Sequence, residues 1–91
     1  MQIRWTIAAA DDLDDIAGYL QTNLPHFSRS TIHRIDAAIR SLRSMPERGR
    51  PGRVDGTREL LIPGLPYLAV YRVKDEAIEI LRVVHGARNR T

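Results

Sequence analysis

Residues 57–88 read TRELLIPGLPYLAVYRVKDEAIEILRVVHGAR and contain three short runs rich in Leu, Ile, Val and Tyr. Two turn signals separate the runs, PGLP at residues 63–66 and KDE at residues 74–76. Apolar runs of this length, bounded by turn-forming residues, are typical of strands joined by hairpins. The stretch therefore predicts a three-stranded antiparallel meander, against which the rest of the chain must pack.

The N-terminal half shows two hydrophobic periods. Residues 2–7 alternate apolar and polar side chains, as in a strand with one buried face, and Trp5 is expected to anchor the core. From residue 8 the spacing is that of an amphipathic helix, and a second helix is expected from His26 to Ser44 because Pro25 ends the first. The stripe of the first helix is Leu13, Ile16, Ala17, Leu20 and Leu24, and that of the second is Phe27, Thr31, Ile35, Ala38, Ile39 and Leu42.

These elements predict one domain over residues 1–91, of the α+β class with the order β-α-α-β-β-β. Two amphipathic helices joined by a tight turn form an antiparallel helical hairpin. Both apolar stripes must be covered, and the sheet is the available partner. We therefore expect an antiparallel sheet with the hairpin packed on one of its faces.

Composition excludes several classes of protein. The chain of 91 residues has no cysteine, so it has no disulfide framework and no thiolate metal site or nucleophile. No apolar run reaches the roughly 18 residues of a membrane span, and residues 1–7 do not resemble a signal peptide. The sequence therefore predicts a soluble cytoplasmic protein with no membrane association, no bound metal and no cofactor.

The charge is unevenly distributed along the chain. Residues 1–28 carry a formal charge of −3 and residues 29–91 carry +6, and Lys74 is the one lysine beside 13 arginines. The guanidinium group is a planar fork of donors that suits phosphate and carboxylate. Coding bias toward arginine is one interpretation, and an anionic partner, either nucleic acid or an acidic protein segment, is the other.

Two charged stretches are candidate sites. The motif DDLDD at residues 11–15 lies near the start of the first helix, where negative charge favours the helix dipole, so we interpret it as a solvated helix N-terminus. Residues 45–56 (MPERGRPGRVDG) are expected to form a mobile loop. Arg48, Arg50 and Arg53 in this loop are candidates for binding an anion, against the alternative of a solvated connector.

The sequence resembles the RelE/ParE superfamily of toxins from type II toxin–antitoxin modules. The motifs that carry the resemblance span nearly the whole chain, in the order found in that superfamily. They are WTIAAADDLDDIAGYL at residues 5–20, PERGRPGR at 46–53, GTREL at 56–60, YLAVYRV at 67–73 and IEILRVVHGAR at 78–88. The resemblance implies an α+β fold and a cognate antitoxin with an acidic, helical toxin-binding segment, which would bind as a helix in a groove or by strand addition. It also implies that DNA is contacted only through the antitoxin.

The superfamily divides by mechanism. Its RelE-like members cleave mRNA on the ribosome, which requires proton transfer and stabilisation of charge on the phosphate. Arg58, Arg72, Arg82 and His85 are the candidates for these catalytic roles. Its ParE-like members, associated with plasmid stabilisation, inhibit growth by poisoning DNA gyrase and are not enzymes.

Two departures favour the ParE-like branch. Nuclease members often carry a basic residue in the strand that corresponds to residues 67–70, and none is present here. They also often place an aromatic residue at the C-terminus, whereas Gly86 follows His85. The sequence therefore favours a gyrase inhibitor, with the ribosome-dependent mRNA endonuclease as the alternative and an inactive toxin, or one with another target, as a further alternative.

The candidate residues for binding the target or the antitoxin are basic and lie in the second half of the chain. Each of these residues also has a structural interpretation. A strand arginine commonly pairs with a carboxylate on a neighbouring strand, and Glu59 and Glu79 are available for this. A histidine at a strand end commonly forms a hydrogen bond to the backbone. The candidates are Arg48, Arg50, Arg53, Arg58, Arg72, Arg82, His85 and Arg88.

Overall fold

The computed structural model, which describes residues 1–86, is an α+β fold built on a five-stranded sheet of order β1-β5-β4-β3-β2. The meander predicted from residues 57–88 is present and antiparallel throughout. Asp75 and Glu76 form its second turn with positive φ angles, as a two-residue hairpin turn requires. The strands are β1 (Gln2–Trp5), β2 (Arg50–Pro51), β3 (Arg58–Leu61), β4 (Tyr67–Lys74) and β5 (Ala77–His85).

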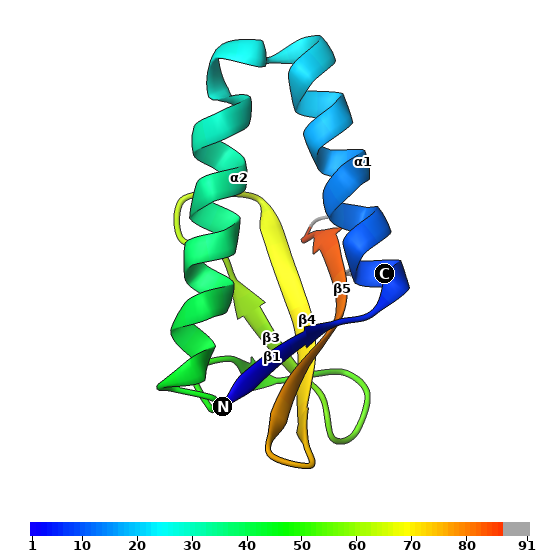
Figure 1. Cartoon of the computed structure of the whole chain (residues 1–91), viewed down its shortest axis with the longest axis vertical. Coiled ribbons are helices and arrows are strands. Elements are labelled where there is room, and N and C mark those ends of the chain that lie inside the picture. The colour runs from blue at the N-terminus through cyan, green and yellow to red at the C-terminus, as the bar shows by residue number, and fades with distance from the viewer. Residues whose placement is uncertain (87–91) are drawn as a thin grey trace.

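Two helices form the predicted hairpin and lie across one face of the sheet (Figure 1). Helix α1 (Ile7–Asn23) begins at Thr6, whose side chain accepts a hydrogen bond from the Ala9 N–H and so caps the helix. Helix α2 (Pro25–Arg40) begins with its proline in the first turn, and a short 3₁₀ helix, η1 (Ser41–Arg43), extends it. The described residues therefore form one layer of helix and one of sheet, and within residues 1–86 no helix covers the other face of the sheet.

The core lies between the helices and the sheet. The side chains that are almost completely buried come from both helices, from η1, from β3, β4 and β5, and from Ile62 just after β3, and Trp5 packs against them from β1. A β-bulge in β5 adjusts which residues face this core: Val70 pairs with Arg82 but Tyr71 pairs with Ile80, so Leu81 is an extra residue. The largest of the fully buried side chains are Tyr71, Ile35, Ile39, Leu42, Ile62, Ile78 and Ile80.

The α+β class and the order of elements are confirmed, and two details differ from expectation. Strand β1 pairs with β5 in parallel, with Ile3 opposite Ile78 and Trp5 opposite Ile80, so the sheet is mixed. This pairing buries the apolar side chains of both strands on the same face. The loop of residues 45–56 also contributes the two-residue strand β2, which pairs with β3.

Candidate functional site

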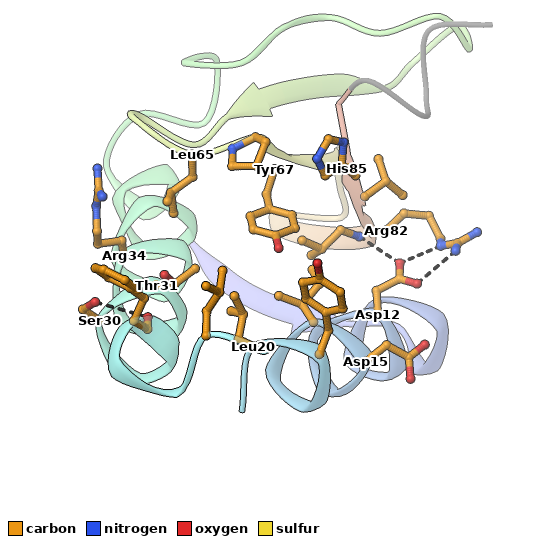
Figure 2. A pocket seen from close by; sticks show the side chains of 17 residues that line it. Asp12, Asp15, Leu20, Ser30, Thr31, Arg34, Leu65, Tyr67, Arg82 and His85 are labelled. Atoms are coloured by element: carbon orange, nitrogen blue, oxygen red, sulfur yellow. Dashed lines mark hydrogen bonds and ion pairs between the residues drawn. The ribbon is translucent and has the colours of Figure 1, made fainter. Parts of the chain in front are cut away.

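A groove of about 920 Å³ lies between the tip of the helical hairpin and the ends of β4 and β5 (Figure 2). We call it the hairpin groove. Its lining is mixed, with apolar and polar surface in similar amounts, and Asp12, Asp15, Arg34 and Arg82 supply charge. The apolar side chains that line it are Ile16, Tyr19, Leu20, Leu24, Phe27, Leu65, Tyr67, Val83 and Val84.

The exposed apolar side chains of the hairpin groove correct the predicted helix stripes. Leu24 and Phe27 were expected in the core, but Phe27 is 60% exposed and Leu24 is also exposed. Both lie at the turn between α1 and α2, which projects beyond the sheet and leaves them without a covering strand (Figure 1). Tyr19 is also 60% exposed, so three large apolar side chains face solvent at one end of the molecule.

Asp12 joins α1 to β5 at the edge of the hairpin groove. Its carboxylate accepts two hydrogen bonds from the Arg82 guanidinium, at 2.7 Å from Nε and 2.9 Å from Nη2, and a third at 2.9 Å from the Val83 N–H. The Asp12 side chain is 14% exposed. The interpretation of residues 11–15 as a solvated helix terminus is therefore wrong for Asp12, and Arg82 pairs with Asp12 in place of a strand glutamate.

The pKa of Asp12 reflects these contacts. Burial acts to raise it, but the hydrogen bonds from Arg82 and from the Val83 N–H, together with the guanidinium charge, hold the pKa of Asp12 below its usual value. The folded pKa is thus lower than the unfolded one. Asp12 therefore contributes stability above the unfolded pKa of about 3.9, and this contribution is lost as the pH falls through the folded value.

The substitution Asp12→Asn is expected to lower the free energy of unfolding at pH 7 by about 1 kcal/mol, at the low end for a charged hydrogen bond because Arg82 is partly exposed. The difference from the wild type should disappear in acid, where Asp12 is protonated. Chemical unfolding between pH 7 and pH 2.5 measures it. Asp14→Asn, at an exposed position of the same helix, is the control, and an equal effect of both substitutions would contradict the assignment.

His85 packs against Tyr67 on the adjacent strand. The two rings meet edge to face at 81°, with centroids 5.9 Å apart, and His85 Nδ1 is buried without a hydrogen-bond partner among the described residues. The backbone bond expected of this histidine is made by its neighbour, because Gly86 donates its N–H to the Pro66 carbonyl at 2.7 Å. An aromatic contact, not a side-chain hydrogen bond, therefore holds His85 in the groove wall.

Arg72 lies on the helix-free face of the sheet and pairs with Glu79, as the cross-strand interpretation predicted. Its Nε lies 2.5 Å from Glu79 Oε1. The hydrogen bond from Arg72 lowers the pKa of Glu79, and the charges of Arg72, Lys74 and Arg4 add to this effect. The contact orders Arg72 along the sheet surface and leaves it outside the hairpin groove.

The loop between η1 and β3, which we call the arginine loop (residues 44–57), is tied to the sheet. The Tyr71 hydroxyl accepts a hydrogen bond from the Gly49 N–H at 2.9 Å and donates one to the Pro46 carbonyl at 2.7 Å. Arg58 Nη1 donates to the Gly49 carbonyl at 2.7 Å and to the Glu47 carbonyl at 3.3 Å. The prediction of a mobile loop is therefore wrong for the residues around Gly49, and Arg58 helps to hold them against the sheet.

The arginines of the arginine loop itself differ in their contacts. Arg48 Nη1 donates to the Ser41 hydroxyl at 2.5 Å. Arg50 forms an ion pair with Glu59 at 3.3 Å, and Glu59 also accepts a bond from the Arg53 N–H at 3.4 Å. Arg48, Arg50 and Arg53 are all exposed, so the loop fixes their backbone while their side chains face solvent.

The predicted site residues thus do not form one site. The structure brings Arg82 and His85 together in the hairpin groove, Arg48, Arg50, Arg53 and Arg58 at the arginine loop, and Arg72 on the open sheet face. Arg88 lies outside the described residues. Within residues 1–86 no three acidic or histidine side chains gather as metal ligands would. No helix in that part of the chain is long and apolar enough to cross a membrane.

Sequence reasoning missed the most distinctive residues of the groove. Tyr19 and Arg34 were assigned no role, and Phe27 was assigned to the core. Arg34 in fact reaches from α2 to the Pro63 carbonyl at 2.6 Å, and Gly64 leaves the space that its guanidinium occupies. The spacing of apolar residues gave no signal for this surface, because the helix stripes continue through it.

Comparison with known proteins first places the chain in a class, the toxins of type II toxin–antitoxin systems. The sequence model of the family described as "ParE toxin of type II toxin-antitoxin system, parDE" matches residues 3–90. The chain therefore belongs to the ParE toxin family, within the RelE/ParE superfamily that its motifs indicated.

Relatives agree with this assignment. A putative toxin, Y4kP, of Sinorhizobium fredii is 39% identical over 93% of this chain and 88% of its own length. Toxin RelE2 of Caulobacter vibrioides is 33% identical over 96% of this chain and 97% of its own length. The class of the protein, a type II toxin, is thus established by sequence.

Two solved structures share the fold. A chain of the chromosomal ParDE system of P. aeruginosa aligns with a TM-score of 0.86 and 32% identity, over 93% of this chain and 95% of that one. A chain of the RelBE2 toxin–antitoxin complex of Mycobacterium tuberculosis aligns with a TM-score of 0.58 and 28% identity, over 92% of this chain and 95% of that one. Both the ParE-like and the RelE-like branches are therefore represented among its structural relatives.

Proposed function

We propose that this toxin is ParE-like in mechanism: it arrests growth by poisoning DNA gyrase in the cytoplasm and is neutralised by a cognate antitoxin that docks in the hairpin groove. The higher TM-score to the ParDE chain than to the RelBE2 chain supports this branch. In this proposal the protein is an inhibitor and not an enzyme, and its stable presence beside an unstable antitoxin would account for a role in plasmid stabilisation.

The observation that carries the proposal is the dispersal of the nuclease candidates. Cleavage of RNA requires a proton-transfer group and a cation aimed at the same phosphate. Here Arg58 donates to backbone carbonyls of the arginine loop, Arg72 pairs with Glu79 on the open sheet face, and Arg82 pairs with Asp12 at the groove. These different engagements support a binding role for the arginines over a shared catalytic one.

The hairpin groove fits the expected antitoxin segment. An amphipathic helix that binds a groove buries apolar anchors at its centre and places charges at the rim. Tyr19, Leu24 and Phe27 supply exposed apolar area. Arg34 and Arg82 offer donors to carboxylates at the margin (Figure 2). The formal charge of the whole chain, +3, also favours an acidic partner.

A RelE-like ribosome-dependent endonuclease is the second candidate. It is favoured by the relative named Toxin RelE2 and by the presence of both Arg82 and His85 at one groove. In that case His85 would be the proton-transfer group, and Arg82 would leave Asp12 to meet the phosphate.

Purified toxin added to a gyrase supercoiling reaction is expected to accumulate linear plasmid after protein denaturation, because a poisoned enzyme keeps its DNA cleaved. Programmed ribosomes with mRNA, treated in parallel, should leave the mRNA intact. Linear plasmid should appear equally with wild-type toxin and with His85→Ala. A-site cleavage of mRNA that disappears in His85→Ala would instead establish the endonuclease.

A further inference from the structure

We propose that the arginine loop is a preformed binding element for the phosphate backbone of nucleic acid, so that the toxin contacts DNA itself. This goes beyond the proposed function, and it departs from the expectation that DNA is contacted only through the antitoxin. If the target is gyrase, the DNA held in the cleavage complex is a ligand of this chemistry.

The backbone of the loop is ordered in part by buried groups that do not belong to its arginines. The Tyr71 side chain is completely buried, and its hydroxyl bonds to Gly49 and Pro46. A Cβ atom at Gly49 would lie 2.7 Å from the Tyr71 ring, so the glycine is needed for this approach. At the far end of the loop, Gly52 donates its N–H to the Thr57 carbonyl at 2.8 Å.

A loop already held in one conformation loses little conformational entropy when it binds, and this favours affinity. Arg48 and Arg53 are exposed on the fixed backbone. The Arg50 side chain is also 58% exposed, although one of its nitrogens lies 3.3 Å from Glu59. The guanidinium forks can therefore meet a ligand without first ordering the loop.

The arginine loop carries a net positive charge. Residues 44–57 hold Arg48, Arg50 and Arg53 against Glu47 and Asp55, a formal charge of +1, and Arg43 and Arg58 flank the loop on either side. A polyanion that approaches the loop therefore meets net positive charge and three exposed arginine side chains.

Position favours nucleic acid over the acidic antitoxin segment, and the spacing of the arginines is compatible with it. Arg48 and Arg53 are five residues apart and span at most about 18 Å, over which one DNA strand presents about five phosphates. Each planar guanidinium matches a phosphate in bidentate geometry. The arginine loop also lies at the opposite end of the molecule from the turn of the helical hairpin (Figure 1), so the groove and the loop do not compete for one partner.

The test measures binding of the full chain to a fluorescein-labelled 20-base-pair duplex by anisotropy between 50 and 200 mM salt, with neither gyrase nor antitoxin present. The double variant Arg48→Gln/Arg53→Gln is compared with Arg4→Gln/Arg29→Gln, which removes the same charge from exposed positions outside the loop. The loop variant is expected to bind about tenfold more weakly at 100 mM salt. The slope of log affinity against log salt concentration should be shallower by about 2, one unit for each lost phosphate contact.

The proposal is overturned if the two double variants lose affinity equally, since binding would then depend on total charge alone. It is also overturned if polyglutamate of matched charge binds as tightly as the duplex with the same dependence on Arg48 and Arg53. Circular dichroism and thermal unfolding of both variants verify the fold. Because gyrase is absent from the assay, its outcome is independent of the plasmid-linearisation experiment, and either proposal can fail without the other.

Discussion

Tyr71→Ala is expected to lower the free energy of unfolding by about 4–8 kcal/mol. The Tyr71 side chain is 0% exposed and lies in the centre of the core, and truncating a buried aromatic residue costs about 3–5 kcal/mol. The hydroxyl bonds to Gly49 and Pro46 are lost as well, which leaves the buried Gly49 N–H unsatisfied at a cost of about 1–3 kcal/mol. A 91-residue domain has a total stability of only about 5–14 kcal/mol.

Urea unfolding followed by far-UV circular dichroism measures the effect. Tyr19→Ala is the matched control, because it makes the same chemical change at a side chain that is 60% exposed, and it should change stability by about 0.5 kcal/mol or less. Equal unfolding midpoints for the two variants would show that Tyr71 does not hold the core as described.

Tyr71→Phe separates the two contributions. The ring remains in place, so the core should persist, while the hydroxyl bonds to the arginine loop disappear. Trypsin is then expected to cut after Arg48 or Arg53 faster than in the wild type, because a loop released from the sheet adopts the extended conformation that the protease binds more readily. Unchanged cleavage at these sites would mean that Arg58 alone is sufficient to hold the loop.

Local periodicity explains why so much of the fold was predictable. The alternation in residues 2–7 and the apolar runs after residue 57 are two-residue patterns, and the stripes in the helices follow the helical repeat. Each pattern depends on the spacing of residues close together in sequence, so it can be recognised without knowledge of the tertiary structure. The turns at residues 63–66 and 74–76 then strongly constrain how β3, β4 and β5 pair.

The contacts that define the candidate sites were not predictable in the same way. Asp12 and Arg82 are 70 positions apart, and Gly49 and Tyr71 are 22 apart. Nothing local marks one aspartate of residues 11–15 as different from the others, because the choice depends on where the bulge at Leu81 directs β5. Likewise, the composition of the arginine loop indicates mobility, and only a tyrosine on another element makes it rigid.

The hairpin groove illustrates a third limit. Residues Leu24 and Phe27 continue the apolar stripes of their helices without interruption, so periodicity assigns them to the core. The turn of the helical hairpin, however, lies beyond the ends of the strands (Figure 1). The stripe there becomes an exposed surface that a partner is able to cover.

Phe27→Asp is expected to abolish neutralisation by the antitoxin while leaving toxicity intact. In the proposed complex Phe27 is a central apolar anchor, and placing an unpaired carboxylate there combines the loss of a hot-spot contact with the desolvation of a charge and with repulsion from an acidic partner. The affinity for the antitoxin should fall about 100-fold or more. Calorimetric titration with the product of the adjacent antitoxin gene measures this change, and growth during co-expression reports it in cells.

Val54→Asp is the matched control for this experiment, because Val54 is an apolar side chain that is 68% exposed in the arginine loop, at the other end of the molecule (Figure 1). It adds the same charge to a comparable surface position, so general repulsion of an acidic antitoxin would weaken both variants alike. Neutralisation lost in Phe27→Asp but kept in Val54→Asp assigns the antitoxin to the hairpin groove. Neutralisation kept in Phe27→Asp would exclude the groove as its docking surface, since a buried carboxylate without a partner is not tolerated at the centre of a tight interface.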